Sequence, residues 1–240
     1  MSESIKNKGW TVTFAGLGIN LALGILYAWS IFKAAIETSI SKGGEGAFNW
    51  NPASLNDPYS VCCLAFAFSM ILAGKCQDKF GPRATAFIGG LLVGSGLILI
   101  SQTNSYAAWV IGFGVLAGTG IGFGYAAATP PGLKWFPASK SGLIAGLVVA
   151  GFGLAPVYIA PLSEYLIGVY GVQTSMLIFG IAFIGIVCIL SLFLVNPPAG
   201  YVAEETNASA AAKKVIVNDV DWKDMIKTLT FWKMWTIYFV

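Results

Sequence analysis

Histidine is absent from this chain, and charged residues are scarce. None of the 240 residues is histidine, and 10% are Asp, Glu, Lys or Arg, against about a quarter in an ordinary soluble domain. The lack of histidine removes the commonest metal ligand and the commonest proton relay near neutral pH. Apolar residues make up 56% of the chain, and the mean hydropathy is +0.73. This exceeds what one globular core needs, so the composition predicts a membrane protein with the lipid bilayer as its solvent.

Motifs of catalysis and of metal binding are also missing. The four cysteines show no Cys-x-x-Cys spacing, and we interpret them as small apolar fillers (Cys62, Cys63, Cys76 and Cys188). The chain has no nucleophile elbow and no phosphate-binding loop. We therefore expect no enzyme activity, no bound metal, no cofactor and no nucleic-acid partner.

Six long apolar segments dominate the sequence. They are residues 11–32, 58–73, 84–100, 106–128, 142–168 and 174–195. A helix needs ~20 residues to cross the hydrocarbon core, and every backbone polar group in lipid must be satisfied within its own segment. The segments do not alternate polar and apolar residues as barrel strands do. The pattern predicts an all-α membrane protein with six transmembrane helices in residues 1–195.

The remainder of the chain divides into two parts. Residues 196–230 are polar, and four apolar residues recur there at helical spacing, which predicts a short amphipathic helix on the membrane surface (Trp222, Met225, Ile226 and Leu229). A further apolar run begins at Phe231 and is cut off at Val240. Ten residues cannot span a bilayer. We expect a truncated seventh helix, and hence a fragment of a longer protein.

Positive charges predict the orientation. If six helices alternate, one side receives nearly all of them (Lys6, Lys8, Lys75, Lys79, Arg83, Lys134, Lys140, Lys213, Lys214, Lys223 and Lys227). Only Lys33 and Lys42 fall on the other side. The positive-inside rule then places the N-terminus and the loop of residues 196–230 in the cytoplasm, with the chain in the plasma (inner) membrane.

Glycine is frequent within the predicted helices. Pairs or runs of glycine occur in the third, fourth and fifth segments (Gly90, Gly94, Gly114, Gly118, Gly120, Gly122, Gly124, Gly142 and Gly146). Glycines four residues apart let a neighbouring helix approach closely, which suits either static packing or helices that slide.

Prolines predict two irregular helices. We expect Pro130 and Pro131 to end the fourth helix, because each removes a backbone donor. Pro156 and Pro161 should bend the fifth helix near residues 151–161, either to line a transport site or for packing alone.

The turn between the second and third segments carries the sharpest motif. It combines helix-breaking Gly81 and Pro82 with Gly74, the acid Asp78 and the bases Lys79 and Arg83. Asp78 should lie near the start of the third helix and pair with these bases or cap a helix end. Residues 74–83 match the pattern G-x-x-x-D-[RK]-x-G-P-[RK] at every fixed position. The chain thereby resembles the major facilitator superfamily, which implies two inverted three-helix repeats and a gating role for this motif.

Further motifs resemble the oxalate/formate antiporter family, across the first half of its twelve helices. They lie at residues 24–30 (GILYAWS), 118–125 (GTGIGFGY), 134–137 (KWFP), 150–154 (AGFGL) and 231–232 (FW). The resemblance implies that a small organic anion binds between this N-terminal half and a missing C-terminal half. By position it places Tyr27, Tyr125 and Phe152 around the anion, with Asn56 on the same pathway.

Two departures argue against oxalate itself. Leu26 stands where oxalate carriers have an amide, and Phe152 lacks a hydroxyl. The family's cationic residues belong to the absent half, and we expect nothing in this half to neutralise a buried dianion.

Two polar residues complete the candidate site. Asn20 shares one helical face with Gly24 and Tyr27, and Glu164 is the only acidic residue deep in an apolar run. Glu164 could bind a coupling proton or line the outer vestibule, or its side chain could simply reach water.

Three functions remain open from the sequence. We expect half of a transporter that works by alternating access. The alternatives are a six-helix chain that homodimerises into a complete transporter, and a transporter-derived sensor or scaffold without flux.

Overall fold

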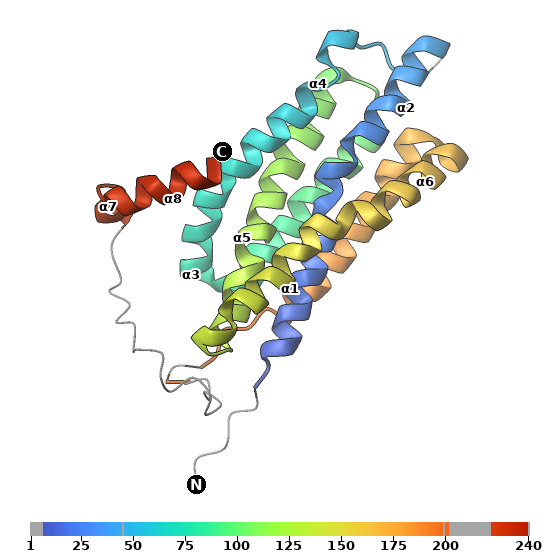
Figure 1. Ribbon diagram of the computed structural model, residues 1–240. Helices are drawn as coiled ribbons and strands as arrows, with labels where there is room; N and C mark the ends of the chain where they lie inside the picture. The colour runs from blue at the N-terminus through green and yellow to red at the C-terminus, as the bar shows by residue number, and fades with distance from the viewer. Residues whose placement is uncertain (1–6, 45, 199, 202–221, 240) are drawn as a thin grey trace. The chain divides into compact units, whose positions relative to one another are not determined.

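The computed structural model describes residues 7–44, 46–198, 200–201 and 222–239, and all regular structure within them is helical (Figure 1). The chain divides into two compact units, Met1–Glu204 and Glu205–Val240, which are treated separately below. Lys6, Lys213 and Lys214 lie outside the described residues, as does most of the predicted linker.

The first helical run spans Gly9–Lys42 and changes its winding halfway. It comprises α1 (Gly9–Leu23), the 3₁₀ stretch η1 (Gly24–Ala28) and α2 (Trp29–Lys42). A Cβ atom at Gly24 would lie 2.1 Å from the Cβ of Ala155, so only glycine permits this close crossing with α6. A mid-helix 3₁₀ stretch often marks a functional position, and Tyr27 lies in this one.

The second run, α3 (Asp57–Ser101), folds back on itself at Gly81. Gly81 has φ 82° and ψ 169°, a backbone conformation that glycine adopts at little cost. The first arm contacts the helix beyond residue 110 with both residue numbers rising together, so the two run parallel (Val61 with Gly114, Cys62 with Gly118, Ser69 with Gly122). The second arm contacts the same helix with one residue number falling as the other rises, so these two run antiparallel (Gly96 with Gly112, Gly89 with Gly124). The two arms are therefore antiparallel, and Figure 1 shows the reversal.

The third run comprises α4 (Tyr106–Trp109), the π-helical η3 (Val110–Ala117) and α5 (Gly118–Lys134). Pro130 and Pro131 lie inside α5, so the prediction that they end this helix was wrong. Each proline removes one backbone donor and leaves the carbonyl four residues earlier without its intrahelical partner, yet the helix continues to Lys134.

The fourth run, α6 (Ser141–Ser191), repeats the reversal at Gly171, with φ 78° and ψ 171°. Its first arm runs parallel to the first helical run (Gly151 with Leu17, Ala155 with Gly24), and its second arm runs antiparallel (Phe179 with Phe32, Leu190 with Gly18). The backbone remains helical at Pro156 and Pro161. The departure from helical φ/ψ in α6 thus lies at Gly171, beyond the region where the prolines predicted a bend.

Four helical runs within the described residues are long and apolar enough to cross a membrane (Gly9–Lys42, Pro52–Ser101, Tyr106–Lys134 and Ala138–Ser191). The all-α membrane fold is therefore confirmed. Six crossings remain a prediction, and the reversals at Gly81 and Gly171 support it because each divides one run into two antiparallel arms. We call the end of this unit that holds Gly9 and Gly81 the near side. The end that holds Lys42 and Gly171 is the far side.

Glycines separate the packed faces from the open ones. A Cβ at Gly94 would lie 2.0 Å from Ile184, and one at Gly89 would lie 2.7 Å from the backbone of Gly124. These positions allow helices to touch backbone to backbone. By contrast, a Cβ at Gly74, Gly142 or Gly146 would meet nothing within 4 Å in the described structure. The close helix contact expected at Gly142 and Gly146 is absent from this part of the chain.

The second unit holds α7 (Trp222–Met225) and α8 (Leu229–Phe239). Lys227 Nζ donates to Asp224 Oδ1 at 2.9 Å, and Trp232 Nε1 donates to the carbonyl oxygen of Ile226 at 2.9 Å. A turn thus separates the two helices, and it interrupts the amphipathic stripe that the sequence predicted, with Leu229 belonging to α8.

Candidate functional site

An aromatic cluster joins four helical segments of the first unit. Phe152 of α6 is its centre, and its ring centroid lies 5.2 Å from Tyr27, 5.1 Å from Tyr125 and 6.1 Å from Phe66. Phe66 and Tyr125 also meet edge to face at 5.7 Å. The fold therefore brings together the three aromatic residues that the sequence singled out. Phe66 was missed, although it lies between Cys62 and Ser69 at the helical spacing of the α3 face that contacts α5.

The cluster presents two phenol groups without protein partners. The hydroxyls of Tyr27 and Tyr125 make no hydrogen bond within the described residues, whereas the hydroxyl of Tyr158 donates to the carbonyl oxygen of Leu21 at 3.0 Å. Phe152 is 6% exposed and Tyr27 is 50% exposed. The cluster thus combines a buried aromatic ring at its centre with free hydroxyl donors, of which that of Tyr27 belongs to a half-exposed side chain.

A pocket of about 510 Å³ opens beside Tyr27. It lies between the start of α2 and the start of α3, and the predicted site residues Tyr27 and Asn56 both line it. Its other lining residues are Leu26, Trp29, Ser30, Lys33, Tyr59 and Ser60. Lys33 was missed as a site residue, and its single ammonium leaves the expectation about a buried dianion a prediction. Only the fold reveals the link, because Lys33 and Asn56 are far apart in the sequence.

Asn20 and Glu164 lie away from this pocket. Asn20 is fully buried, its Nδ2 donates to the carbonyl oxygen of Val148 at 2.8 Å, and its Oδ1 has no partner in the described structure. It stands seven residues from Tyr27, roughly 10 Å along the helix. Glu164 is exposed and lies twelve residues from Phe152 along α6, roughly 18 Å away.

The turn motif forms the reversal of α3. Gly81 turns the chain, its carbonyl oxygen accepts from Thr85 Oγ1 at 3.0 Å, and Pro82 begins the second arm. Asp78 lies in the last turn of the first arm rather than near the start of the next helix. Within the described residues its exposed carboxylate forms no ion pair with Lys79 or Arg83, so the predicted pairing was wrong. The adjacent bases instead extend outwards, and Lys79 Nζ lies 5.2 Å from the ring centroid of Phe80.

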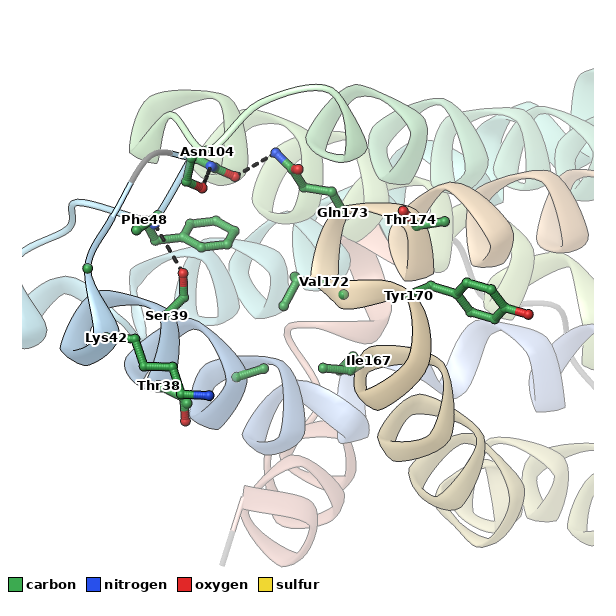
Figure 2. Close-up of a pocket in the computed structure, with 15 residues that line it drawn as sticks. Thr38, Ser39, Lys42, Phe48, Asn104, Ile167, Tyr170, Val172, Gln173 and Thr174 are labelled. Carbon is green, nitrogen blue, oxygen red and sulfur yellow. Dashed lines mark hydrogen bonds between the residues drawn. The ribbon is translucent and has the colours of Figure 1, made fainter.

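A second pocket of about 540 Å³ lies on the far side (Figure 2). Gln173 Nε2 donates to Asn104 Oδ1 at 2.7 Å, and Asn104 Nδ2 donates to the carbonyl oxygen of Gly46. Figure 2 also shows the bond from the backbone N–H of Phe48 to Ser39. These bonds tie together three far-side turns. None of the predicted site residues lines this pocket, and we interpret it as structural.

Long apolar helices, two glycine reversals and a polar pocket against an aromatic cluster are features of a multi-pass membrane transporter. The family model of the Major Facilitator Superfamily matches residues 11–240, and the chain belongs to that superfamily. Its members are transporters that bind small molecules within the membrane.

Three curated relatives show which transporters within the superfamily this chain is similar to. The oxalate:formate antiporter of Oxalobacter formigenes is 27% identical over 97% of this chain and 52% of its own length. Apicoplast pyruvate carrier 1 of Toxoplasma gondii is 27% identical over 65% of the chain and 35% of its own length. Monocarboxylate transporter 1 of Bos taurus is 28% identical over 72% of the chain and 33% of its own length. The chain thus spans about a third to a half of the length of these relatives.

Proposed function

We propose that this chain forms the N-terminal half of a secondary transporter for small organic anions, either mono- or dicarboxylates. The observation that carries the proposal is the convergence of Tyr27, Tyr125 and Phe152 beside a pocket that also holds Asn56 and Lys33. Free phenol hydroxyls and an ammonium can replace the water around a carboxylate, and hydrogen bonds to a charged acceptor are stronger than neutral ones. The rings of the aromatic cluster exclude water from the bound anion.

The charge distribution supports an orientation with the near side in the cytoplasm of a plasma (inner) membrane. The described near-side residues of the first unit include six cations and one acid (Lys8, Lys75, Lys79, Arg83, Lys134, Lys140 and Asp78). The described far-side residues include two cations and three acids (Lys33, Lys42, Glu37, Asp57 and Glu164). Positive residues favour the cytoplasmic side. Glu164 would then lie towards the outer end of the first arm of α6 and line the outer vestibule, with Asn20 buried below the site.

The mechanism that we propose is alternating access between this half and a second half, in the same or a separate chain. The relatives' greater length supports a second half. Open glycines at Gly74, Gly142 and Gly146 leave smooth surfaces along which a second bundle can slide. The motif from Gly74 to Arg83 would hold the near side closed in one state through its unpaired Asp78. Binding the anion more tightly in one state than in the other would shift the equilibrium between them.

Transport into proteoliposomes tests this proposal. The assembled transporter, this half together with its second half, is reconstituted, and uptake of radiolabelled formate, pyruvate and oxalate is measured with and without unlabelled carboxylate inside. We expect saturable uptake of at least one carboxylate. Binding without uptake would favour a sensor, and uptake by this chain alone with disulfide-trapped pairs would favour a homodimer. Either result would overturn the proposed half-transporter.

A further inference from the structure

The pocket beside Tyr27 is lined by two facing helical surfaces that are rich in hydrogen-bond donors. On α2, Trp29 and Lys33 are four residues apart and therefore share one face, with Ser30 beside them. At the start of α3, Asn56 precedes the helix as its N-cap, and the hydroxyl of Ser60 donates to the carbonyl oxygen of Asn56 at 3.1 Å, with Tyr59 beside them. The lining residues offer one ammonium, an amide and several hydroxyls. No acidic residue lines this pocket.

Trp29 is a buried donor that lacks a partner in the described structure. It is 4% exposed, and its Nε1 makes no hydrogen bond in the described part of the chain. Two neighbouring tryptophans of the same far-side ring cluster are satisfied: Trp50 Nε1 donates to the carbonyl oxygen of Asn104 at 2.7 Å, and Trp109 Nε1 donates to that of Thr103 at 3.0 Å. Buried polar groups nearly always have partners, so this indole N–H is an exception; the nitrogen itself has almost no exposed surface, and the residue contributes its ring to the pocket wall.

Lys33 supplies the charge of the pocket. Its Nζ lies 3.9 Å from Glu37 Oε1, whereas the pair of Lys227 with Asp224 closes to 2.9 Å. The long contact with Glu37, whose side chain is 52% exposed, leaves the ammonium of Lys33 available to another acceptor. Lys33 stands six residues beyond Tyr27, roughly 9 Å farther towards the far side.

We infer that Lys33 forms a docking site for the carboxylate of a monocarboxylate anion, at the far-side approach to Tyr27 and Tyr125. The inference rests on the proposed function and goes beyond it by assigning a second anion site and a preferred charge. One ammonium balances one negative charge, and a second carboxylate would remain uncompensated in this half. The ammonium of Lys33 binds the carboxylate, and the free tyrosine hydroxyls receive it next. The pocket volume of about 510 Å³ admits such an anion with several waters.

Kinetics of the assembled transporter test the docking site. Uptake of radiolabelled formate and pyruvate is measured for the wild type, Lys33→Gln, Lys33→Arg and Lys42→Gln. Lys42 lies on the same helix and the same side but outside the pocket, so its neutralisation is the matched control for the general surface charge. We expect Lys33→Gln to raise KM roughly ten- to a hundredfold, because a hydrogen bond to a charged group is lost. Lys33→Arg and Lys42→Gln should stay within about threefold of the wild type.

Chemical rescue separates charge from folding. Lys33→Cys is treated with 2-aminoethyl methanethiosulfonate, which restores a positive charge, or with methyl methanethiosulfonate, which does not. The wild type, with its own four cysteines, receives the same reagents. We expect the cationic reagent alone to restore a low KM.

The failures are distinguishable. An unchanged KM in Lys33→Gln, or equal rescue by both reagents, would overturn the docking site while the proposed function stands. Uptake of oxalate with neither formate nor pyruvate would overturn the monocarboxylate preference alone. Uptake of no carboxylate by the wild type would overturn the proposed function itself.

Discussion

The ring of Tyr27 meets the ring of Phe152 edge to face, with centroids 5.2 Å apart and an interplanar angle of 70°. This contact joins the 3₁₀ stretch of the first helical run to α6 at the point where Gly24 brings the two backbones together. It also holds the Tyr27 ring at the mouth of the pocket. The 3₁₀ stretch η1 therefore contains both Gly24, which contacts α6, and the candidate binding residue Tyr27.

Removing single hydroxyl groups should separate binding from stability. We expect Tyr27→Phe and Tyr125→Phe each to raise the KM for a carboxylate roughly tenfold, because each loses a hydrogen bond to a charged acceptor. Neither should change the thermal unfolding temperature in detergent, since neither hydroxyl has a protein partner in the described structure. Tyr158→Phe is the control, because its hydroxyl binds Leu21. It should lower stability by about 1 kcal/mol and leave KM unchanged. If Tyr158→Phe raised KM while Tyr27→Phe and Tyr125→Phe lowered only stability, the anion would bind elsewhere.

The turn motif makes its own prediction. We expect Asp78→Asn to alter the uptake rate without lowering stability. The carboxylate is exposed and unpaired in the described residues, and an acid in the last turn of a helix opposes the macrodipole. Membrane insertion and unfolding are measured alongside uptake. Normal kinetics in this variant would exclude a gating role, and loss of folding would show a structural one.

Glycine substitutions should divide according to the packing. Gly24→Ala would place a Cβ 2.1 Å from that of Ala155, so we expect a loss of roughly 1–3 kcal/mol in unfolding free energy. Gly146→Ala is the matched control, because its Cβ would meet nothing within 4 Å in the described structure. It should be neutral or slightly stabilising, as alanine favours the helix. Equal effects of the two substitutions on unfolding in detergent would refute this packing.

Tryptophan substitutions test the unsatisfied indole independently of transport. Trp29→Phe and Trp50→Phe remove similar volumes from similarly buried sites, since the two residues are 4% and 5% exposed. Only Trp50→Phe also breaks a hydrogen bond, to Asn104. We therefore expect Trp50→Phe to unfold more easily than Trp29→Phe by about 1–3 kcal/mol. A larger loss for Trp29→Phe would indicate that its Nε1 has a partner within the protein.

Much of this architecture follows from local patterns. Apolar runs of sufficient length predicted the membrane fold, and Gly81 followed by Pro82 predicted the first reversal. The second reversal falls in the gap between the fifth and sixth predicted segments, but Gly171 itself was not singled out, because a single glycine between apolar runs gives no signal of a positive φ. The failure at Pro130 and Pro131 has a different cause: a proline removes one backbone donor, but transmembrane helices tolerate this loss where neighbouring groups pair with the freed carbonyl.

The site was predictable to the extent that it depends on single residues. Tyr27, Tyr125 and Phe152 were found by their position in motifs, and the fold brings them together. Phe66 and Lys33 were missed because their roles arise from contacts between helices that are distant in the sequence. The pairing of Asp78 was wrong because proximity along the chain does not set where a side chain points at a helix end.

A double-mutant cycle on Tyr27 and Tyr125 tests the central claim most directly. The KM for the transported carboxylate is measured for the wild type, Tyr27→Phe, Tyr125→Phe and the double variant in the assembled transporter. If one carboxylate binds both hydroxyls, the two losses should be coupled by about 0.5 kcal/mol or more. Strictly additive losses, or no loss in either single variant, would contradict a shared anion at this cluster.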